Sequence, residues 1–427
     1  MPRLRVLVSA YAFSPYRGSE HAVGWNVVTR LARHHDVTVL CGDVSARLET
    51  RQELNRFAAE NPPIPGLTIH YVAPSKLITL IERVHAIPGF WAIYYLAYNL
   101  WQRRAYREAV TLHRQRPFHL AHQLNMIGYR EPGYLWKLPI PFVWGPVGGA
   151  ANEPLAFLPL FSWRGRFSVI ARNAVNWMQK QFGCRPRKAA RRAAKLWTVT
   201  SADHQMATRF WHVQAEPMIE TGTAGQPNLP TRARQEHEPL HVVWSGLHEP
   251  RKALPIVLQA IAGLPFPDRT RLTVLGDGLE SAAWKRLAGQ LGVSGLIQWT
   301  GKLPRDQAMA RMLEAHVCAF PSLKEGTPHV VLESLSLGLP VICHDACGMG
   351  IAVTDQSGIK IPLIDPQTSI AGFRQAIQRF LDEPELLSTL SAGALRRAQE
   401  LSWDRKAQTF AQAYEDVVAM EAKHAGC

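Results

Sequence analysis

The chain has 427 residues, of which 47% are hydrophobic and 19% charged, values that are typical of a globular protein. A chain of this length is too long for one ordinary core, so we expect two domains of about 200 residues each. The six cysteines form no Cys-x-x-Cys pair, which argues against a zinc site and favours free thiols in a reducing compartment.

The net charge of +14 is concentrated in the first half of the chain. Residues 1–213 carry 28 Lys and Arg against 11 Asp and Glu, a net charge of +17, whereas residues 214–427 carry 20 against 23, a net charge of −3. A basic domain attracts nucleic acid, an anionic membrane or a phosphorylated substrate, and charge alone does not choose among them. The segment after Met1 is too short for a secretory signal, so we expect a cytoplasmic protein.

Short apolar runs that end at glycine or polar residues recur along the chain and predict strands. In the first half these are residues 6–9, 37–40, 68–72, 142–144 and 196–198, and in the second half residues 242–245, 272–275, 297–299, 317–320 and 340–343. Helical patterns such as residues 22–33, 254–262 and 306–314 lie between them. This alternation predicts an α/β fold with two doubly wound, Rossmann-like domains, and the cleft between two such domains is the expected ligand site.

Composition predicts the domain boundaries. Residues 214–239 are rich in proline, glycine and charge and are the expected linker between domains of residues 1–213 and 240–400. Within residues 401–427, the spacing of apolar side chains predicts an amphipathic helix that ends the chain and packs back toward the N-terminal domain.

The most informative segment is residues 320–342, which predicts a strand, a loop, a helix, a glycine stop and a second strand. Thr327 is the predicted N-cap of the helix and Pro328 its first residue, because a missing N–H costs nothing there. The free N–H groups of such a helix end favour a phosphate or a sugar hydroxyl. Glu325 precedes the helix and Glu333 lies within it, where a carboxylate can accept two hydrogen bonds from the cis hydroxyls of a ribose.

This segment resembles the Glu-x7-Glu signature of glycosyltransferase family 4, which comprises retaining enzymes of the GT-B fold, and in particular its bacterial exopolysaccharide and cell-surface polysaccharide members. Two glutamates at this spacing arise by chance about once in a chain of this composition, so the surrounding string gives the resemblance its specificity. The resemblance implies that Glu325 contacts the donor sugar hydroxyls and Glu333 the ribose, with Gly326, Thr327 and Pro328 also in the donor site. The alternative is two glutamates on a solvated helix start.

A second match lies in residues 244–254, which look like the Gly-Arg-x4-Lys element of the same family. Gly246 and Lys252 match this element, whereas Leu247 stands where the family has arginine, so Arg251 is the candidate for the missing charge. In the family, two cations hold the donor diphosphate and stabilise it as it leaves. An exposed Arg-Lys pair at a helix start is the alternative.

Several glycine turns add support. Gly276, Gly278 and Gly301 resemble the strand-end turns near the nucleotide base of the family, although turn glycines are also common without a ligand. In the first half, Gly18 and Glu20 follow the first strand and resemble the loop over the donor phosphate and the acceptor site.

His122 fits the cleft histidine of the Asp-x-x-His pattern of the family. His119 replaces the aspartate of this pattern, and Leu124 replaces a second histidine. We expect a catalytic role for His122, with a packed or solvated histidine as the alternative. The turn of residues 144–149 is the expected acceptor-side backbone.

No Asp-x-Asp pair occurs, so no two carboxylates are presented to a divalent metal, and we predict neither a metal site nor a cofactor. The resemblance implies retaining transfer of a hexose-type sugar from a nucleotide diphosphate sugar to a saccharide acceptor, although the residues alone are equally compatible with inversion. The alternatives are another GT-B enzyme, such as a phosphorylase or a nucleotide-sugar epimerase, or a non-catalytic binding protein. Nucleic acid is not an expected partner, because the basic residues form no recognised RNA or DNA motif.

Two segments predict contact with a membrane. Residues 87–101 are strongly apolar and aromatic but fall short of the roughly 20 residues that span a bilayer. Residues 157–195 mix aromatic with basic side chains, as does an amphipathic surface on anionic lipid. Such a surface suits a lipid-linked saccharide acceptor at the inner face of the cytoplasmic membrane. Core aromatics beside a solvated basic face are the alternative.

Overall fold

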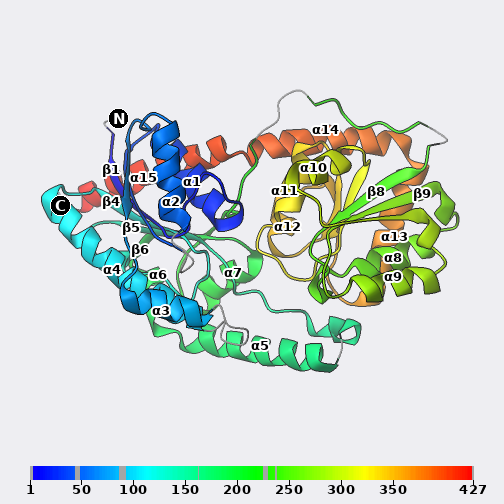
Figure 1. Ribbon diagram of the computed structural model, residues 1–427, viewed down its shortest axis with the longest axis horizontal. Coiled ribbons are helices and arrows are strands. Elements are labelled where there is room, and N and C mark those ends of the chain that lie inside the picture. Colours follow the sequence, from blue (N-terminus) through cyan, green and yellow to red (C-terminus); the bar gives the residue numbers. More distant parts are fainter. Residues whose placement is uncertain are drawn as a thin grey trace. The chain divides into compact units, whose positions relative to one another are not determined.

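The computed structural model describes residues 3–43, 49–85, 93–161, 163–224, 229–235 and 238–425. The chain divides into two compact units (Figure 1). The N-terminal unit comprises Met1–Ala150, Met178–Thr221 and Trp403–Cys427, and the C-terminal unit comprises Ala151–Trp177 and Gly222–Ser402. Each unit is built on its own parallel sheet, which confirms the predicted pair of Rossmann-like α/β domains.

The N-terminal unit holds a seven-stranded sheet in the order β3-β2-β1-β4-β5-β6-β7. Its strands are β1 (Arg5–Ala10), β2 (Asp36–Cys41), β3 (Leu67–Tyr71), β4 (Leu120–Asn125), β5 (Phe142–Val147), β6 (Ala193–Thr198) and β7 (Glu216–Pro217). In the register of the sheet, Val6 of β1 lies opposite Val37 on one side and Leu120 on the other. The strand order reverses between β1 and β4, and ligands bind beyond the carboxyl ends of strands at such a point.

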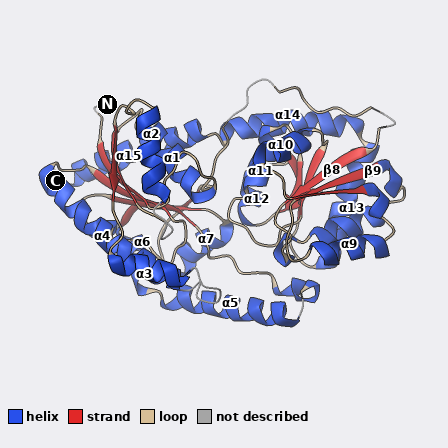
Figure 2. Ribbon diagram, viewed as in Figure 1, coloured by secondary structure: helices blue, strands red, loops and turns tan. Residues whose placement is uncertain are grey.

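Helices cover both faces of this sheet (Figure 2). They are α1 (Ser19–Leu31), α2 (Glu49–Glu60), α3 (Lys76–His85), α4 (Tyr94–Gln115), α6 (Cys184–Arg192), α7 (Ser201–Gln205) and α15 (Trp403–Ala425). Because side chains alternate along a strand, Val6 and Val8 of β1 join the core formed with α1 and α15, whereas Leu7 joins the core formed with α4. The C-terminal helix α15 thus packs in the N-terminal unit, with the ring of Phe410 centred 4.8 Å from that of Trp197.

The C-terminal unit holds a six-stranded sheet in the order β10-β9-β8-β11-β12-β13. Its strands are β8 (Leu240–Ser245), β9 (Thr270–Leu275), β10 (Ile297–Gly301), β11 (Val317–Phe320), β12 (Val341–His344) and β13 (Gly358–Ile361). Its helices are α8 (Leu254–Ala262), α9 (Ser281–Gln290), α10 (Arg305–Leu313), α11 (His329–Ser336), α12 (Cys347–Ala352), α13 (Pro366–Asp382) and α14 (Pro384–Glu400). The order again reverses, here between β8 and β11, so the loops after these two strands are the expected ligand-binding loops.

The units divide the chain differently from the linear boundaries that composition predicts. Residues 151–177, which the sequence assigns to the first domain, cluster with the C-terminal unit. The physical reason is the short 3-10 helix η3 (Leu155–Leu160), because Phe157 within it and Phe161 after it are buried in the core of that unit. The ring of Phe157 lies with its centroid 6.2 Å from that of His344.

The described part of the apolar run of residues 87–101 is divided between core and surface, since Tyr95 and Leu96 are exposed, at 39% and 54%. Residues 86–92 lie outside the described residues. After them, Tyr98 and Trp101 of α4 are buried in the core of the N-terminal unit, and the Trp101 indole N–H donates to the Val72 carbonyl at 2.9 Å. The alternative of core aromatics therefore holds for Tyr98 and Trp101.

Each unit also buries one histidine whose two ring nitrogens are hydrogen-bonded. In the N-terminal unit, His122 Nε2 lies 2.7 Å from the Gly145 carbonyl, and Nδ1 lies 2.6 Å from the Tyr414 hydroxyl. Burial lowers the pKa of His122 to about 4, and it does the same for His344 in the C-terminal unit. Both imidazoles are therefore neutral at pH 7, and both are buried inside their units.

These histidines predict a pH-dependent stability. The folded protein resists protonation until about pH 4, whereas the unfolded chain takes up protons near pH 6.5, so stability falls as the pH drops from about 6.5 to about 4. Each histidine contributes up to roughly 3 kcal/mol of this loss. Urea unfolding at several pH values should show a flatter dependence for His122→Gln than for the wild type. An unchanged slope would show that His122 is not a buried neutral group.

Candidate active site

The Glu-x7-Glu segment lies in the C-terminal unit at the carboxyl end of β11 and runs through a loop into α11. The helix begins at His329, with Pro328 in the N-cap position at φ −70° and ψ 126°, one residue later than predicted. Thr327 therefore does not cap the helix from the predicted position but lies in the loop, 5% exposed. The shift follows from the backbone of Pro328 itself, because its ψ of 126° is extended and the helical conformation starts only at the next residue.

Glu325 is the centre of a charged cluster in this loop. Its Oε1 atom lies 2.8 Å from Arg251 Nη1 and 2.6 Å from Lys252 Nζ, and it accepts a hydrogen bond of 2.6 Å from the Ser322 hydroxyl. The structure thus brings together the three residues that the sequence places in two separate motifs. It adds Ser322, which no sequence signal indicated.

Lys252 is the more buried of the two cations, with 12% of its side chain exposed, against 35% for Arg251. Burial lowers the pKa of Lys252, while the charge of Glu325 opposes that shift. The ammonium lies 5.0 Å above the ring of Phe320, the last residue of β11. A buried cation needs a partner, and the carboxylate of Glu325 supplies it here.

Arg251 reaches the same carboxylate from the neighbouring position in the chain. Its Nε lies 3.0 Å from Glu249 Oε2, and its carbonyl accepts the Leu323 N–H at 2.8 Å. These contacts tie the 3-10 turn η5 (Pro250–Lys252) after β8 to the loop after β11. Leu247 occupies the position where the family has arginine, so this position carries no charge. The residue is 54% exposed.

Glu333 is held by a residue that the sequence analysis did not identify. Its Oε1 accepts hydrogen bonds from Arg305 Nε at 3.1 Å and Nη2 at 2.8 Å. The side chain of Glu333 is 25% exposed and that of Arg305 is 75% exposed, so this carboxylate is open to solvent beside an exposed guanidinium. Arg305 and Glu333 are 28 residues apart in the chain, so no short sequence motif links them.

The predicted glycine turns pack against each other. At Gly276, φ is +117°, and a Cβ would lie 1.9 Å from the Gly246 carbonyl oxygen. At Gly278, a Cβ would lie 2.7 Å from the His248 carbonyl oxygen. Gly301 has no atom within 4 Å of such a Cβ but takes φ +70°. Glycine at the first two positions is therefore required by the contact between loops, and at Gly301 it is favoured by the backbone conformation.

In the N-terminal unit, Gly18 and Glu20 lie at the start of α1, after β1. The Ile127 N–H lies 3.4 Å from Glu20 Oε1, and the Asn125 side chain donates to the Glu20 carbonyl at 3.0 Å. Among the described residues, Glu20 Oε2 has no hydrogen-bond partner although it is buried. Burial raises the pKa of Glu20 to about 7, so this side chain is partly protonated near neutral pH.

His122 does not belong to an open site. It is fully buried, and the carbonyl of Gly145 and the hydroxyl of Tyr414 occupy both ring nitrogens. The prediction of a catalytic histidine is corrected on this ground, because a general acid or base must reach the substrate. The packed histidine that the sequence left as an alternative is the observed state.

Comparisons with known proteins agree with this architecture. Residues 228–397 match the family of glycosyl transferases group 1. A D-inositol 3-phosphate glycosyltransferase of Streptomyces bingchenggensis is 31% identical over 187 residues, which are 41% of this chain and 40% of that protein. The chain therefore spans about two fifths of the length of this relative.

Two solved structures show the fold over nearly the whole chain. Sucrose-phosphate synthase from Thermosynechococcus elongatus has a TM-score of 0.61, with 16% identity over 98% of this chain and 100% of that one. HepE of Anabaena in complex with UDP has a TM-score of 0.58, with 12% identity over 97% of this chain and 100% of that one. The chain therefore has the GT-B fold, and its residues 228–397 match the family of glycosyl transferases group 1.

Proposed function

We propose that the protein is a retaining glycosyltransferase of family 4 that transfers a hexose-type sugar from a nucleotide diphosphate sugar to a saccharide acceptor. The observation that carries the proposal is the cluster in which Arg251 and Lys252 meet Glu325 beyond the carboxyl ends of β8 and β11. This is the place where doubly wound folds bind nucleotides. UDP is the first nucleotide to test, because HepE binds it.

Without a ligand, Glu325 pairs with both cations, and Glu249 pairs with Arg251 as well. A donor diphosphate brings at least two negative charges and competes with Glu325 for Arg251 and Lys252. As the bond from the anomeric carbon to the phosphate oxygen breaks, the same cations stabilise the negative charge that grows on the diphosphate. Glu325 is then released to accept hydrogen bonds from the sugar hydroxyls. Glu333, exposed beside Arg305, is the proposed partner of the ribose hydroxyls.

In the proposed reaction, the acceptor hydroxyl attacks the anomeric carbon on the face that the nucleotide leaves. The new bond joins the acceptor oxygen to the anomeric carbon, and the proton of the hydroxyl passes to the departing phosphate oxygen. The chain then needs no nucleophile of its own. Because two side-chain cations supply the charge that a metal would otherwise provide, we propose a metal-independent donor site without a cofactor.

The acceptor has a second candidate. The Streptomyces relative is named for D-inositol 3-phosphate, and the +17 charge of residues 1–213 favours a phosphorylated acceptor as well as a lipid-linked saccharide. Transfer assays that offer both acceptors with the donor that binds will distinguish them.

The donor site predicts nucleotide-dependent stabilisation in the presence of a chelator. One nucleoside diphosphate among UDP, GDP and ADP should raise the midpoint of thermal unfolding, because a ligand at about 100 times its Kd stabilises the fold by roughly 2.7 kcal/mol. Glu333→Ala should abolish the rise. The matched control is Glu314→Ala, which removes another exposed glutamate that pairs with an arginine, Arg311, and should keep it.

If none of the nucleotides raises the midpoint, the donor site is wrong. If the rise needs Mg²⁺, the metal-independent part of the proposal is wrong. Dependence on added phosphate in the transfer assay would favour a phosphorylase instead.

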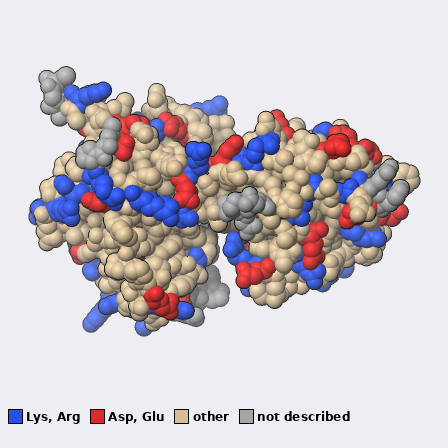
Figure 3. Space-filling view, turned by 90° about the horizontal axis from the view of Figure 1, so that it is seen from above, with Lys and Arg blue, Asp and Glu red and all other residues tan. Residues whose placement is uncertain are grey.

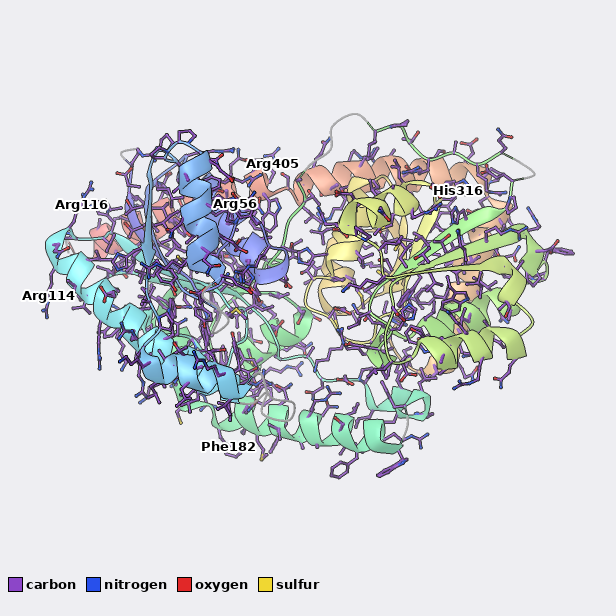
Figure 4. The ribbon with its side chains drawn as sticks, in the orientation of Figure 1. Arg56, Arg114, Arg116, Phe182, His316 and Arg405 are labelled. Atoms are coloured by element: carbon purple, nitrogen blue, oxygen red, sulfur yellow. The ribbon has the colours of Figure 1, made fainter. Side chains whose placement is uncertain are left out.

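We also propose that the enzyme lies on the inner face of the cytoplasmic membrane through α5 (Trp163–Phe182). Trp163 is 74% exposed, Phe167 72%, Ile170 50% and Trp177 51%, and their spacing of four, seven and fourteen residues places them on one side of the helix. Phe182, at the end of the helix, is 69% exposed (Figure 4). Such a face binds lipid through its aromatic side chains.

The charge of the chain fits an anionic lipid surface. Residues 163–195, which include α5, carry ten Lys and Arg and no Asp or Glu. Figure 3 shows the molecule from above, away from the lower edge where Figure 1 draws α5, and there a further band of Lys and Arg side chains crosses the N-terminal unit. Basic residues near an anionic leaflet each contribute about 1 kcal/mol to binding. Among the helices of the described residues, none is long and apolar enough to cross a membrane.

The membrane proposal predicts a loss of vesicle binding in Phe167→Ser. Burial of a phenylalanine contributes about 1.5–3 kcal/mol, so the partition of this variant onto vesicles with phosphatidylglycerol should fall about tenfold or more in a sedimentation assay. The control is Phe266→Ser, because Phe266 is 61% exposed on the same unit but lies outside α5. Equal partition of the two variants, or no binding by the wild type, would contradict the proposal.

A further inference from the structure

A surface pocket of about 480 Å³ lies in the N-terminal unit and is distinct from the cluster around Glu325. It is lined by Arg103, Tyr106, Arg107, Tyr134 and Lys137, and we call it the basic pocket. The first three residues come from α4, and the last two flank or end the short 3-10 helix η2 (Leu135–Lys137) after β4. Its volume lies within the range of small-molecule sites, about 300–1,000 Å³.

Three of the five lining residues of the pocket are cations, and none is a carboxylate. Across the described parts of the chain, Arg103, Arg107 and Lys137 form no salt bridge. Arg103 Nε donates to the Tyr134 hydroxyl at 3.2 Å, and Lys137 Nζ lies 5.1 Å above the Tyr134 ring. Arg103 and Arg107 stand one helical turn apart, where like charges weaken a helix. The three cations therefore present a local concentration of positive charge to an incoming anion.

Tyr134 forms the inner wall of the pocket, and hydrogen bonds of its hydroxyl hold it in place. Tyr134 is 9% exposed, and its hydroxyl accepts from Arg103 and Arg185 and lies 3.3 Å from Asn99 Oδ1. Burial alone would raise the pKa of Tyr134, but its hydrogen bonds with Arg103 and Asn99 and the nearby guanidinium charges outweigh burial and lower it. The nearby carboxylate of Glu131 is engaged by Arg185 and by Asn99 at 3.0 Å.

This chemistry suits one class of ligand. Guanidinium groups bind phosphate oxygens in a planar, bidentate geometry, and an ammonium adds a point charge. Because the Tyr134 hydroxyl donates its hydrogen to Asn99, Tyr106 is the tyrosine of the pocket that supplies a further donor. We propose that the basic pocket is a second anion site, which binds a phosphate or diphosphate group separately from the nucleotide-sugar donor. The group can come from a soluble phosphate compound or from a lipid headgroup. The proposal does not depend on the transferase activity, since none of its residues belongs to the donor cluster.

Protection of Lys137 from acetylation, measured by mass spectrometry on the full chain, tests this proposal. Lys137 is exposed and should be labelled readily. Pyrophosphate, at constant ionic strength, should slow its labelling at least fivefold if the source is soluble, and vesicles with phosphatidic acid should do so if the source is a headgroup. The internal control is Lys285, which lies 5.7 Å above the Trp299 ring in the C-terminal unit and should label at an unchanged rate.

The matched variants are Arg107→Ala and Arg114→Ala. Both arginines are exposed on α4, but Arg114 lies outside the pocket, near the C-terminal end of the helix (Figure 4). Protection of Lys137 should disappear in Arg107→Ala and remain in Arg114→Ala. The proposal is overturned if neither probe protects Lys137, if Lys285 is protected equally, or if Arg107→Ala retains full protection.

Discussion

The contact between Lys252 and Glu325 is the interaction on which the candidate site depends. Both side chains are nearly buried, with 12% and 11% exposed, and a buried charge is costly unless an opposite charge and hydrogen bonds satisfy it. This ion pair joins the turn after β8 to the loop after β11. The Ser322 hydroxyl and the Leu323 N–H of the loop also donate hydrogen bonds to the Arg251 carbonyl of the turn. The Glu325 carboxylate therefore pairs with both cations and holds the two loops together.

Much of the fold could be predicted because its physical signals are local. Short apolar runs gave strands whose observed bounds are mostly a little longer, and α8 spans residues 254–262 as expected. The strands β4, β7 and β13 were not among the predicted apolar runs. Polar side chains interrupt β4 and β13, and β7 has only two residues. The Glu325 loop was recognisable because proline, glycine and the two glutamates constrain one short stretch. The start of α11 was wrong by one residue, because Pro328 has an extended ψ and takes the N-cap position in place of Thr327.

What could not be predicted depends on contacts between distant residues. His122 fits a catalytic pattern by spacing. Only the packing of α15 shows that the Tyr414 hydroxyl is hydrogen-bonded to one of its ring nitrogens. Arg305 reaches Glu333 across 28 residues. The sequence also did not show which aromatic residues after position 156 are buried. In the structure, Phe157 is fully buried whereas Trp163 is 74% exposed. A sequence shows which side chains are apolar, but the side of the helix that meets a core decides which of them are covered.

The central claim is that Lys252 holds the diphosphate of the donor, and calorimetric titration of UDP and of uridine tests it most directly. A charge-assisted hydrogen bond contributes about 1.5–3 kcal/mol, so Lys252→Met should weaken UDP binding about tenfold or more and leave uridine binding unchanged. The control is Lys360→Met, because Lys360 also pairs with a carboxylate of the same unit, Asp345, at 3.3 Å. If Lys252→Met binds UDP as the wild type does, or loses UDP and uridine in parallel, Lys252 does not hold the diphosphate.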